Sequence, residues 1–244
     1  MREQAGAEVE VWRIPLSAEP EPEGRPSALE DLLDDHERSR ARMGKVPGMR
    51  RRFVRAHAAA RIILGARLGR APGAVRFTRG RWGKPSVEDA AGTHFSLSHS
   101  GDLALLALAP RPVGVDLELA RADLDFTRLA RRFFPEAERD SVVRGGRDTF
   151  VRLWTRKEAC VKAAGGRLTQ GMGVPVAHTA PQAVVRDPAG ALAGPWRVAD
   201  LALPDGYAGA VALLGGGPFS VSSRMWYDMP PEESDAMSAT RGVK

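Results

Sequence analysis

The chain has 244 residues, 43% of them hydrophobic and 27% charged, and this length suits one large domain or two smaller ones that each bury a core. Its single cysteine, Cys160, excludes an internal disulfide and any cysteine-rich metal site, and we expect it to pack in the core. The acidic N-terminus and the lack of an apolar run of about 18 residues predict a cytoplasmic protein that does not span a membrane.

The formal net charge of +6 favours a polyanionic partner, and nucleic acid is one candidate. Aromatic residues form only 6% of the chain, and it contains no helix-turn-helix pattern, zinc-finger spacing or paired stacking aromatics. A nucleic-acid-binding protein is therefore an alternative, which predicts magnesium-independent DNA binding that weakens steeply with salt. We expect no nucleic-acid partner, but an anionic small molecule or an acidic protein.

The two halves of the chain repeat one order of elements, in which helix-rich sequence is followed by a strand, a glycine turn and a second strand. The first half closes with residues 100–106 and the second with residues 204–211. This faint internal repeat predicts two similar subdomains, over residues 1–110 and 111–226, followed by a disordered tail over residues 227–244.

A basic segment lies in the first half of the chain, before a predicted helix. The run Arg50 to Arg55 leads into a helix predicted over residues 57–69, which carries Arg61. A charge run of this kind is usually a solvated helix face, but its cations are also suited to phosphate. Both interpretations stay open.

A β-hairpin is predicted over residues 93–108, because Thr93 to Ser98 alternates, Gly101-Asp102 is a turn signal and an apolar strand follows. Ser98 and His99 lie at its exposed end, where they either shape the turn or contact a ligand. A hydrolase triad is excluded, because adjacent residues on a strand face opposite ways and no G-x-S-x-G elbow is present.

The next two elements gather charges. Residues 113–118 predict a strand that points Asp116 and Glu118 to one face, and residues 150–164 predict a helix with Trp154, Glu158 and Lys162 along one stripe. Carboxylate oxygens suit magnesium, and a metal beside a lysine suits phosphate chemistry. The ordinary alternative is an i,i+4 helix pair worth about 0.2–0.5 kcal/mol.

Lysine is rare in this chain, and its few positions are therefore informative. Only five of the 36 basic residues are lysine. We expect Lys84, Lys157 and Lys162 to be needed as compact point charges, which arginine does not supply.

These segments together resemble one family, the 4′-phosphopantetheinyl transferases of the surfactin-synthetase-activating (Sfp) type. The likeness is carried by Gly83-Lys84-Pro85, by residues 95–101 (FSLSHSG), by residues 114–118 (GVDLE) and by residues 154–162 (WTRKEACVK). The resemblance implies an α+β fold of two similar α/β subdomains related by a pseudo-two-fold, with the active site in the cleft between them.

The resemblance also implies a reaction. Such enzymes use Mg²⁺ and coenzyme A, and transfer the 4′-phosphopantetheine arm to a serine hydroxyl of acyl or peptidyl carrier proteins of polyketide or nonribosomal peptide biosynthesis, releasing adenosine 3′,5′-bisphosphate. A monomer is implied, because one chain assembles the whole site. The alternative within this fold is a binder of coenzyme A or nucleotide that has lost turnover.

Matching the family motifs residue by residue implies three sets of site residues. The implied metal ligands are Asp116, Glu118 and Glu158. Glu158 would also be the base that takes the proton of the serine, and Lys162 would stabilise charge on the pyrophosphate. The residues implied to bind coenzyme A are Arg52, Arg61, Lys84, Ser98, His99, Asp116, Lys157 and Lys162.

Within that last set the expected contacts differ. Arg52 and Arg61 are matched to the 3′-phosphate, with Lys45 or Arg50 as open alternatives, and Lys84 is matched to the adenine and its ribose phosphate. The remaining cations, with Ser98 and His99, are matched to the phosphates. The carrier protein is expected to dock beside residues 120–146, whose apolar members include Leu124, Phe126, Leu129, Phe133 and Phe134.

Overall fold

The computed structural model describes residues 6–17, 28–44, 46, 48–90 and 92–227, so Lys45 and the predicted tail from residue 228 onward lie outside the described residues. The strands are β1 (Ala7–Pro15), β2 (Phe77–Arg79), β3 (Pro85–Val87), β4 (His94–Ser100), β5 (Leu103–Ala109), β6 (Val113–Leu119), β7 (Gln182–Val185), β8 (Trp196–Asp200), β9 (Tyr207–Leu214) and β10 (Phe219–Met225). The helices are α1 (Ala28–Asp31), α2 (Asp35–Arg42), α3 (Met49–Leu68), the 3₁₀ turn η1 (Pro72–Ala74), α4 (Phe126–Phe133), α5 (Glu136–Ala164) and α6 (Leu168–Gly171).

These elements confirm the α+β class. They also contain the hairpin predicted over residues 93–108, the strand predicted over residues 113–118 and the helix predicted over residues 150–164. The basic helix begins at Met49, so it includes the arginine run that the sequence placed before it. Within the described ranges, no helix is long and apolar enough to cross a bilayer.

Two four-stranded sheets form the centre of the molecule. The first has the order β10-β1-β5-β4 and the second the order β6-β9-β8-β7, while β2 and β3 form a separate hairpin. All strand pairs are antiparallel except β1 and β10, which run parallel. Strand β10 joins the first sheet, although the predicted C-terminal subdomain, residues 111–226, includes it; the division into two subdomains stays a prediction.

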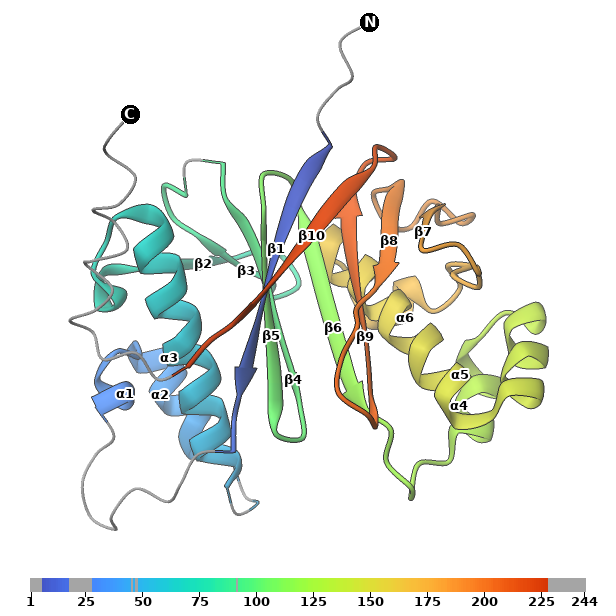
Figure 1. Cartoon of the computed structure of the whole chain (residues 1–244), viewed down its shortest axis with the longest axis horizontal. Helices are drawn as coiled ribbons and strands as arrows, with labels where there is room; N and C mark the ends of the chain where they lie inside the picture. Colours follow the sequence, from blue (N-terminus) through green and yellow to red (C-terminus); the bar gives the residue numbers. More distant parts are fainter. Residues whose placement is uncertain (1–5, 18–27, 45, 47, 91, 228–244) are drawn as a thin grey trace, which may run out of the picture.

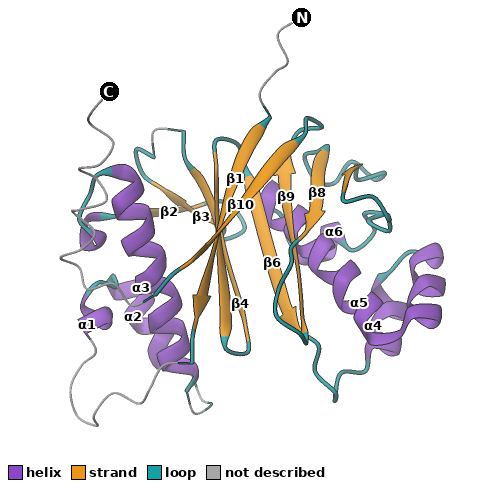
Figure 2. Cartoon of the chain, viewed as in Figure 1, coloured by secondary structure: helices purple, strands orange, loops and turns teal. Residues whose placement is uncertain are grey.

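The molecule has four layers, in the order α3, first sheet, second sheet and α5 (Figure 1). Figure 2 shows the same arrangement by secondary structure, with helices on the two outer sides and strands between them. Apolar residues fill all three spaces between the layers. Every residue of β5 is buried, because Leu103, Leu105 and Ala107 face the second sheet while Ala104 and Leu106 face α3.

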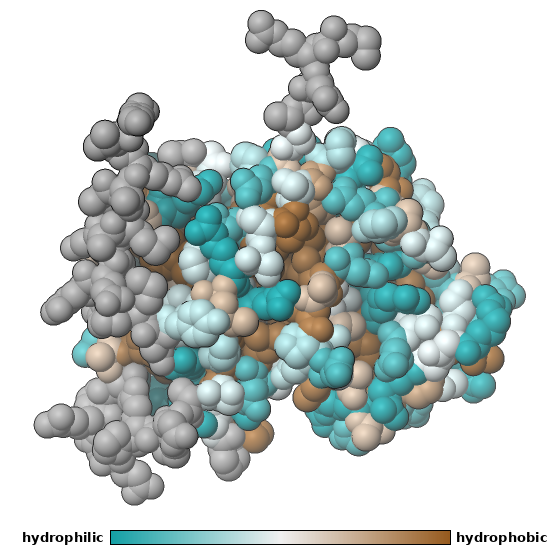
Figure 3. Space-filling model, in the orientation of Figure 1, coloured by the Kyte–Doolittle hydropathy of each residue, from teal (hydrophilic) through white to brown (hydrophobic). Residues whose placement is uncertain are grey.

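The face seen in Figure 3 is mostly polar, with apolar atoms near its middle over β1 and β10. The exposed large apolar residues of β10 are Val221 and Met225, which are 37% and 38% exposed. Scattered exposed apolar residues of this kind are normal for a folded protein.

The long helix α5 is bent. Gly146 has φ 66° and ψ −153°, which are not helical values and fall in a region of backbone space that glycine tolerates. The bend turns the first segment of α5 back toward the second, so Glu138 forms an ion pair with Lys157 at 2.6 Å. In a straight helix these two residues would be about 28 Å apart.

Candidate active site

The edge strands β4 and β6 belong to different sheets, and serine hydroxyls of β4 join them. Ser98 Oγ donates to Asp116 Oδ1 at 2.8 Å, and Ser100 Oγ donates to Glu118 Oε2 at 2.8 Å. A third serine, Ser96, accepts from the backbone N–H of Val115 at 3.1 Å. The three serines lie on one face of β4 because alternate strand residues point the same way.

Helix α5 brings a cation to the contact between β4 and β6, which we call the seam. Lys162 Nζ donates to Asp116 Oδ1 at 2.6 Å and to Ser98 Oγ at 2.9 Å. The close approach of α5 to β6 depends on Gly114, because a Cβ atom there would overlap the carbonyl oxygen of Ala159 and the amide nitrogen of Ala163. The structure therefore brings together Ser98, Asp116 and Lys162, as the sequence predicted for one site.

We expect Gly114→Ala to destabilise the protein by about 1–3 kcal/mol or more, the usual cost of overpacking, because backbone atoms of α5 cannot rotate away. The change would also move Lys162 away from Asp116. Thermal unfolding measures the first effect. Gly73→Ala is the matched control, since a Cβ there meets nothing within 4 Å and should shift stability by less than about 0.5 kcal/mol. Equal unfolding midpoints for the two variants would contradict the contact.

Three carboxylates repel one another at the site. Burial, followed by the charge of Asp116, raises the pKa of Glu158 to about 7, and Glu118 adds to the shift while Lys162 and a hydrogen bond from Trp154 oppose it. Burial and the charge of Asp116 also raise the pKa of Glu118. Bringing a further positive charge to the site would relieve this repulsion.

The donors suit a hard divalent cation in chemistry. Asp116 is 3% exposed, and among the described residues its Oδ2 atom has no hydrogen-bond partner, although Oδ1 has two. Carboxylate oxygens of this kind are the preferred protein ligands of magnesium. Within the described ranges, no group of three or more His, Cys, Asp or Glu side chains is already arranged around a common point, so the set of three ligands remains a prediction.

Cations line the other side of the seam. His99 keeps part of its surface exposed, but neighbouring side chains surround its imidazole. This partial burial is the main cause that lowers the pKa of the imidazole, and the positive neighbours His57, Lys162 and Arg40 lower it further. His57 stacks on Phe53 at 3.9 Å between ring centroids, and the Arg40 guanidinium lies 6.0 Å from the same ring. Arg40 on α2 and His57 on α3 were missed by the sequence analysis, because nothing local in the sequence links either helix to a strand that lies tens of residues later.

The comparisons with known proteins fit this site. A family model described as the 4′-phosphopantetheinyl transferase superfamily matches residues 112–212, which include β6 and the second segment of α5. The 4′-phosphopantetheinyl transferase HetI of Nostoc sp. is 36% identical over 229 residues, covering 90% of this chain and 92% of the relative. The chain belongs to the 4′-phosphopantetheinyl transferase family.

Shorter matches agree with this membership. The 4′-phosphopantetheinyl transferase Sfp of Bacillus subtilis is 30% identical over 106 residues, or 42% of this chain and 45% of the relative. The 4′-phosphopantetheinyl transferase AcpT of Salmonella typhimurium is 38% identical over 124 residues, or 48% of this chain and 62% of the relative. The predicted resemblance to the Sfp type is thus confirmed, and the chain is a transferase.

The two arginines matched to the 3′-phosphate lie on opposite faces of α3 in this transferase. Arg52 forms an ion pair at 2.7 Å with Asp102, in the β4–β5 turn close to His99. Arg61 is 1% exposed and binds Glu37 at 2.6 Å and Asp34 at 2.7 Å. Nine residues are about two and a half helical turns, which explains the opposite directions. The predicted phosphate contact of Arg61 does not fit its buried position.

Arg50 and Lys45 were the alternative residues for contact with the 3′-phosphate. Arg50 forms an ion pair at 2.8 Å with Glu30, on α1. Lys45 lies outside the described residues. Of the residues matched to the 3′-phosphate, Arg52 is the one that the structure places next to the β4–β5 turn.

Lys84 connects the two halves of the transferase. Its Nζ donates to the carbonyl oxygens of Val113 at 3.0 Å and Ala163 at 3.4 Å, and burial lowers the pKa of this ammonium to about 8. A pocket of about 290 Å³ lies between Lys84 and the pair Glu158 and Lys162. Lys84 therefore lines a cavity next to the site, although its ammonium is already bound by backbone carbonyls.

Lys157 is placed in the core rather than at the site. Its side chain is 0% exposed, and its Nζ donates to the carbonyl oxygen of Val174 and pairs with Glu138. Successive helix residues differ by about 100° in direction, so Lys157 cannot share the face of its neighbour Glu158. The structure thus places Lys157 in the core beside Glu138, away from Asp116 and Lys162, and its predicted contact with the phosphates is not proposed further.

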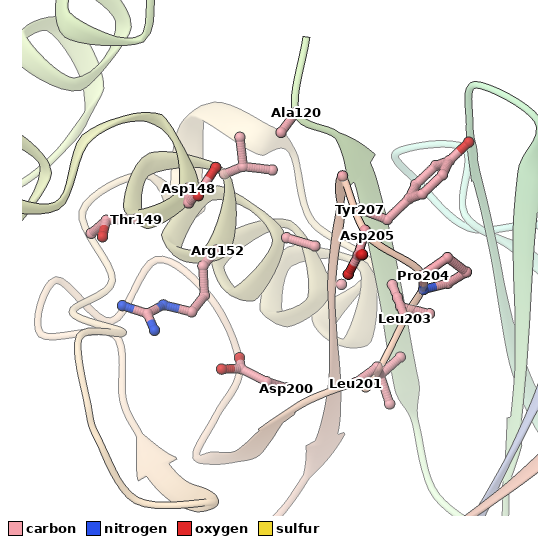
Figure 4. Close-up of a pocket in the computed structure, with 14 residues that line it drawn as sticks. Ala120, Asp148, Thr149, Arg152, Asp200, Leu201, Leu203, Pro204, Asp205 and Tyr207 are labelled. Carbon is pink, nitrogen blue, oxygen red and sulfur yellow. The ribbon is translucent and has the colours of Figure 1, made fainter.

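A second and larger pocket, of about 390 Å³, lies between α5 and the β8–β9 connection (Figure 4). Asp148, Arg152 and Asp205 contribute charged groups to it, and none of the predicted site residues lines it. The size of a cavity thus does not locate the charged seam of β4, β6 and α5.

Proposed function

We propose that this transferase moves the 4′-phosphopantetheine arm of coenzyme A to a serine hydroxyl of acyl or peptidyl carrier proteins, in the presence of Mg²⁺. The carrier proteins would be those of polyketide or nonribosomal peptide biosynthesis. The observation that carries the proposal is the cluster of Asp116, Lys162 and Ser98, with Glu118 and Glu158 beside it.

Glu158 would take the proton from the serine hydroxyl. Without a bound cation, burial and the charge of Asp116 raise the pKa of this carboxyl to about 7; a cation held beside it would lower the pKa again and keep the carboxylate ionised, ready to accept a proton. The serine oxygen forms a bond to the phosphorus that carries pantetheine, and the bridging P–O bond breaks. The bridging oxygen leaves with adenosine 3′,5′-bisphosphate, and the Lys162 ammonium neutralises the charge that develops there.

The bound Mg²⁺ would neutralise pyrophosphate oxygens, and Asp116, Glu118 and Glu158 would hold it. The unpartnered Oδ2 of Asp116 and the mutual repulsion of the three carboxylates support this assignment. Asp116 Oδ1 is shared with Lys162, so the cation and the carboxylate already neutralise each other across the seam.

Coenzyme A would bind along the cationic side of the seam. His99 and Arg52 are the predicted residues that lie there, and Arg40 and His57 extend the same surface. A positive surface suits a substrate with several phosphate charges, because it lowers the cost of bringing those charges together.

The carrier protein would dock beside α4. Of the five apolar residues expected there, Phe134 is buried in the core, and the other four are half-buried. Arg128, Arg131 and Arg132 of α4 are exposed, and the Arg132 guanidinium lies over the Phe133 ring. Their positive charges suit an acidic helical partner.

We further propose a cytoplasmic monomer with no nucleic-acid or membrane partner. One chain supplies β4, β6 and α5, so the seam needs no second subunit. Coenzyme A and an acidic carrier protein are both anionic, so they are partners that suit the net charge of +6.

The test is intact-mass analysis of an apo carrier protein incubated with the transferase and coenzyme A. We expect a gain of one phosphopantetheine arm with magnesium and none after chelation. Coenzyme A binding without any gain on several carriers would support a non-catalytic binder. Salt-sensitive DNA binding that ignores magnesium and coenzyme A would support a nucleic-acid-binding protein.

A further inference from the structure

Ser98 and Ser100 use their hydroxyls in the same way. Ser98 accepts from Lys162 Nζ and donates to Asp116, while Ser100 accepts from the backbone N–H of Leu119 at 3.1 Å and donates to Glu118 at 2.8 Å. In both pairs the serine and its carboxylate are 18 residues apart in sequence. Two steps along β4 thus match two steps along β6, and the strands lie in fixed register.

The single proton of the Ser100 hydroxyl is committed. A hydroxyl has one O–H donor, and because its oxygen accepts from Leu119, the proton points to Glu118 Oε2. A donor aimed at a carboxylate favours the ionised form and fixes its direction. Ser100 therefore acts on Glu118 from the opposite sheet.

Ser100 itself is held firmly. It is the last residue of β4, and the next turn is fastened to β9, because the backbone N–H of Asp102 donates to the Tyr207 hydroxyl at 3.0 Å. A Cβ atom on Gly101 would lie 2.6 Å from that hydroxyl, so the turn and Tyr207 are in tight contact. The strand end cannot shift relative to β9, which pairs with β6 along its whole length.

We propose that Ser100 is a positioning residue, which holds the Glu118 carboxylate in register with Asp116 so that both face the same bound cation. The proposal rests on the proposed function. It assigns a role to a hydroxyl that does not itself touch the reacting atoms. Groups that orient a metal ligand typically change metal affinity or activity by about 10–100-fold when removed.

Ser96 provides a matched control on the same face of the same strand. Its hydroxyl also accepts from a backbone N–H of β6, that of Val115, but has no carboxylate partner among the described residues. Ser100→Ala and Ser96→Ala each leave one backbone N–H without its acceptor. Only Ser100→Ala also removes a hydrogen-bond donor from a carboxylate, that of Glu118.

The experiment measures three quantities for wild type, Ser100→Ala, Ser100→Thr and Ser96→Ala. These are Mg²⁺ affinity by calorimetry without carrier protein, kcat and KM for coenzyme A, and the unfolding midpoint. We expect Ser100→Ala to weaken Mg²⁺ binding and lower kcat by about 10-fold or more, with KM for coenzyme A unchanged. Ser100→Thr, which keeps the hydroxyl, should restore both quantities. Ser96→Ala should lower the unfolding midpoint to a similar extent but bind Mg²⁺ like wild type.

The outcomes separate the two proposals. If wild type transfers phosphopantetheine while Ser100→Ala matches Ser96→Ala in Mg²⁺ affinity and kcat, the positioning role is overturned and the proposed function stands. If wild type neither binds Mg²⁺ nor transfers the arm to any carrier, the proposed function fails and the positioning role with it.

Discussion

Replacing Glu158 with glutamine is expected to lower the turnover of phosphopantetheine transfer by at least ~10²-fold while the protein stays folded. The amide has nearly the shape of the carboxylate, but it cannot accept the serine proton and is a weaker ligand for a cation. The loss should be in kcat, because the cationic residues that would hold coenzyme A are unchanged. Single-turnover transfer to an apo carrier, followed by intact mass, measures it.

The stability of this variant has a predicted pH dependence in chelator. Folding raises the pKa of Glu158 from 4.5 to about 7, so the group binds more protons folded than unfolded between these values. The stability that it contributes is full below about pH 4.5 and is lost as pH rises through 7. Glutamine has no such loss, so we expect Glu158→Gln to gain in unfolding free energy relative to wild type between pH 5 and pH 8.

Glu30→Gln is the control, because Glu30 lies on α1, where it pairs with Arg50, and no atom of it contacts Asp116, Glu118, Glu158 or Lys162. It should transfer the arm at the wild-type rate. The role given to Glu158 would be wrong if its glutamine variant kept turnover within about threefold of wild type. An unfolding midpoint no lower than that of wild type would show that any loss of turnover is not caused by loss of folded protein.

Local periodicity in the sequence was sufficient for the parts of the site that lie within one element. Asp116 and Glu118 are two apart on a strand, and Glu158 and Lys162 are four apart on a helix, so each pair shares a face whatever surrounds it. The hairpin that carries Ser98 and His99 was predictable from alternation and a glycine turn. The resemblance to the Sfp type added the link between these elements.

Long-range contacts could not be predicted in the same way. The pairing of β10 with β1 joins residues more than 200 positions apart, and no local pattern in either strand names its partner. Arg40 reaches the site only because α2 folds against α3. Arg61 has the charge expected of a phosphate ligand, but its direction was fixed by its position on α3 and by Glu37.

Lys157 shows that a long-range contact can be missed even for a residue within a recognised motif. The scarcity of lysine and the match of residues 154–162 to the family motif assigned Lys157 to the phosphates. Its actual partner, Glu138, comes close only because α5 bends at Gly146. Glu138 also accepts from the backbone N–H groups of Val176 and Ala177, so this ion pair joins both segments of α5 to the loop that follows α6.

Lys157→Met is therefore expected to act on stability rather than on substrate binding. Removing one member of a buried ion pair typically costs about 3–5 kcal/mol, because the remaining charge stays buried without its partner. Glu138 is 2% exposed, so its carboxylate has little access to water after the change. In a chain of this length, the loss corresponds to a fall of about 6–20 °C in the unfolding midpoint.

Two further variants identify the cause. Adding Glu138→Gln to Lys157→Met removes the stranded charge but keeps a carbonyl oxygen for Val176 and Ala177, so most of the lost stability should return. Arg121→Met breaks the exposed pair with Asp123, 66% and 70% exposed, and should leave the unfolding midpoint close to that of wild type. Folded Lys157→Met, assayed well below its midpoint, should keep the wild-type KM for coenzyme A. A raised KM with an unchanged midpoint would instead place Lys157 on the phosphates, as its position in the motif suggested.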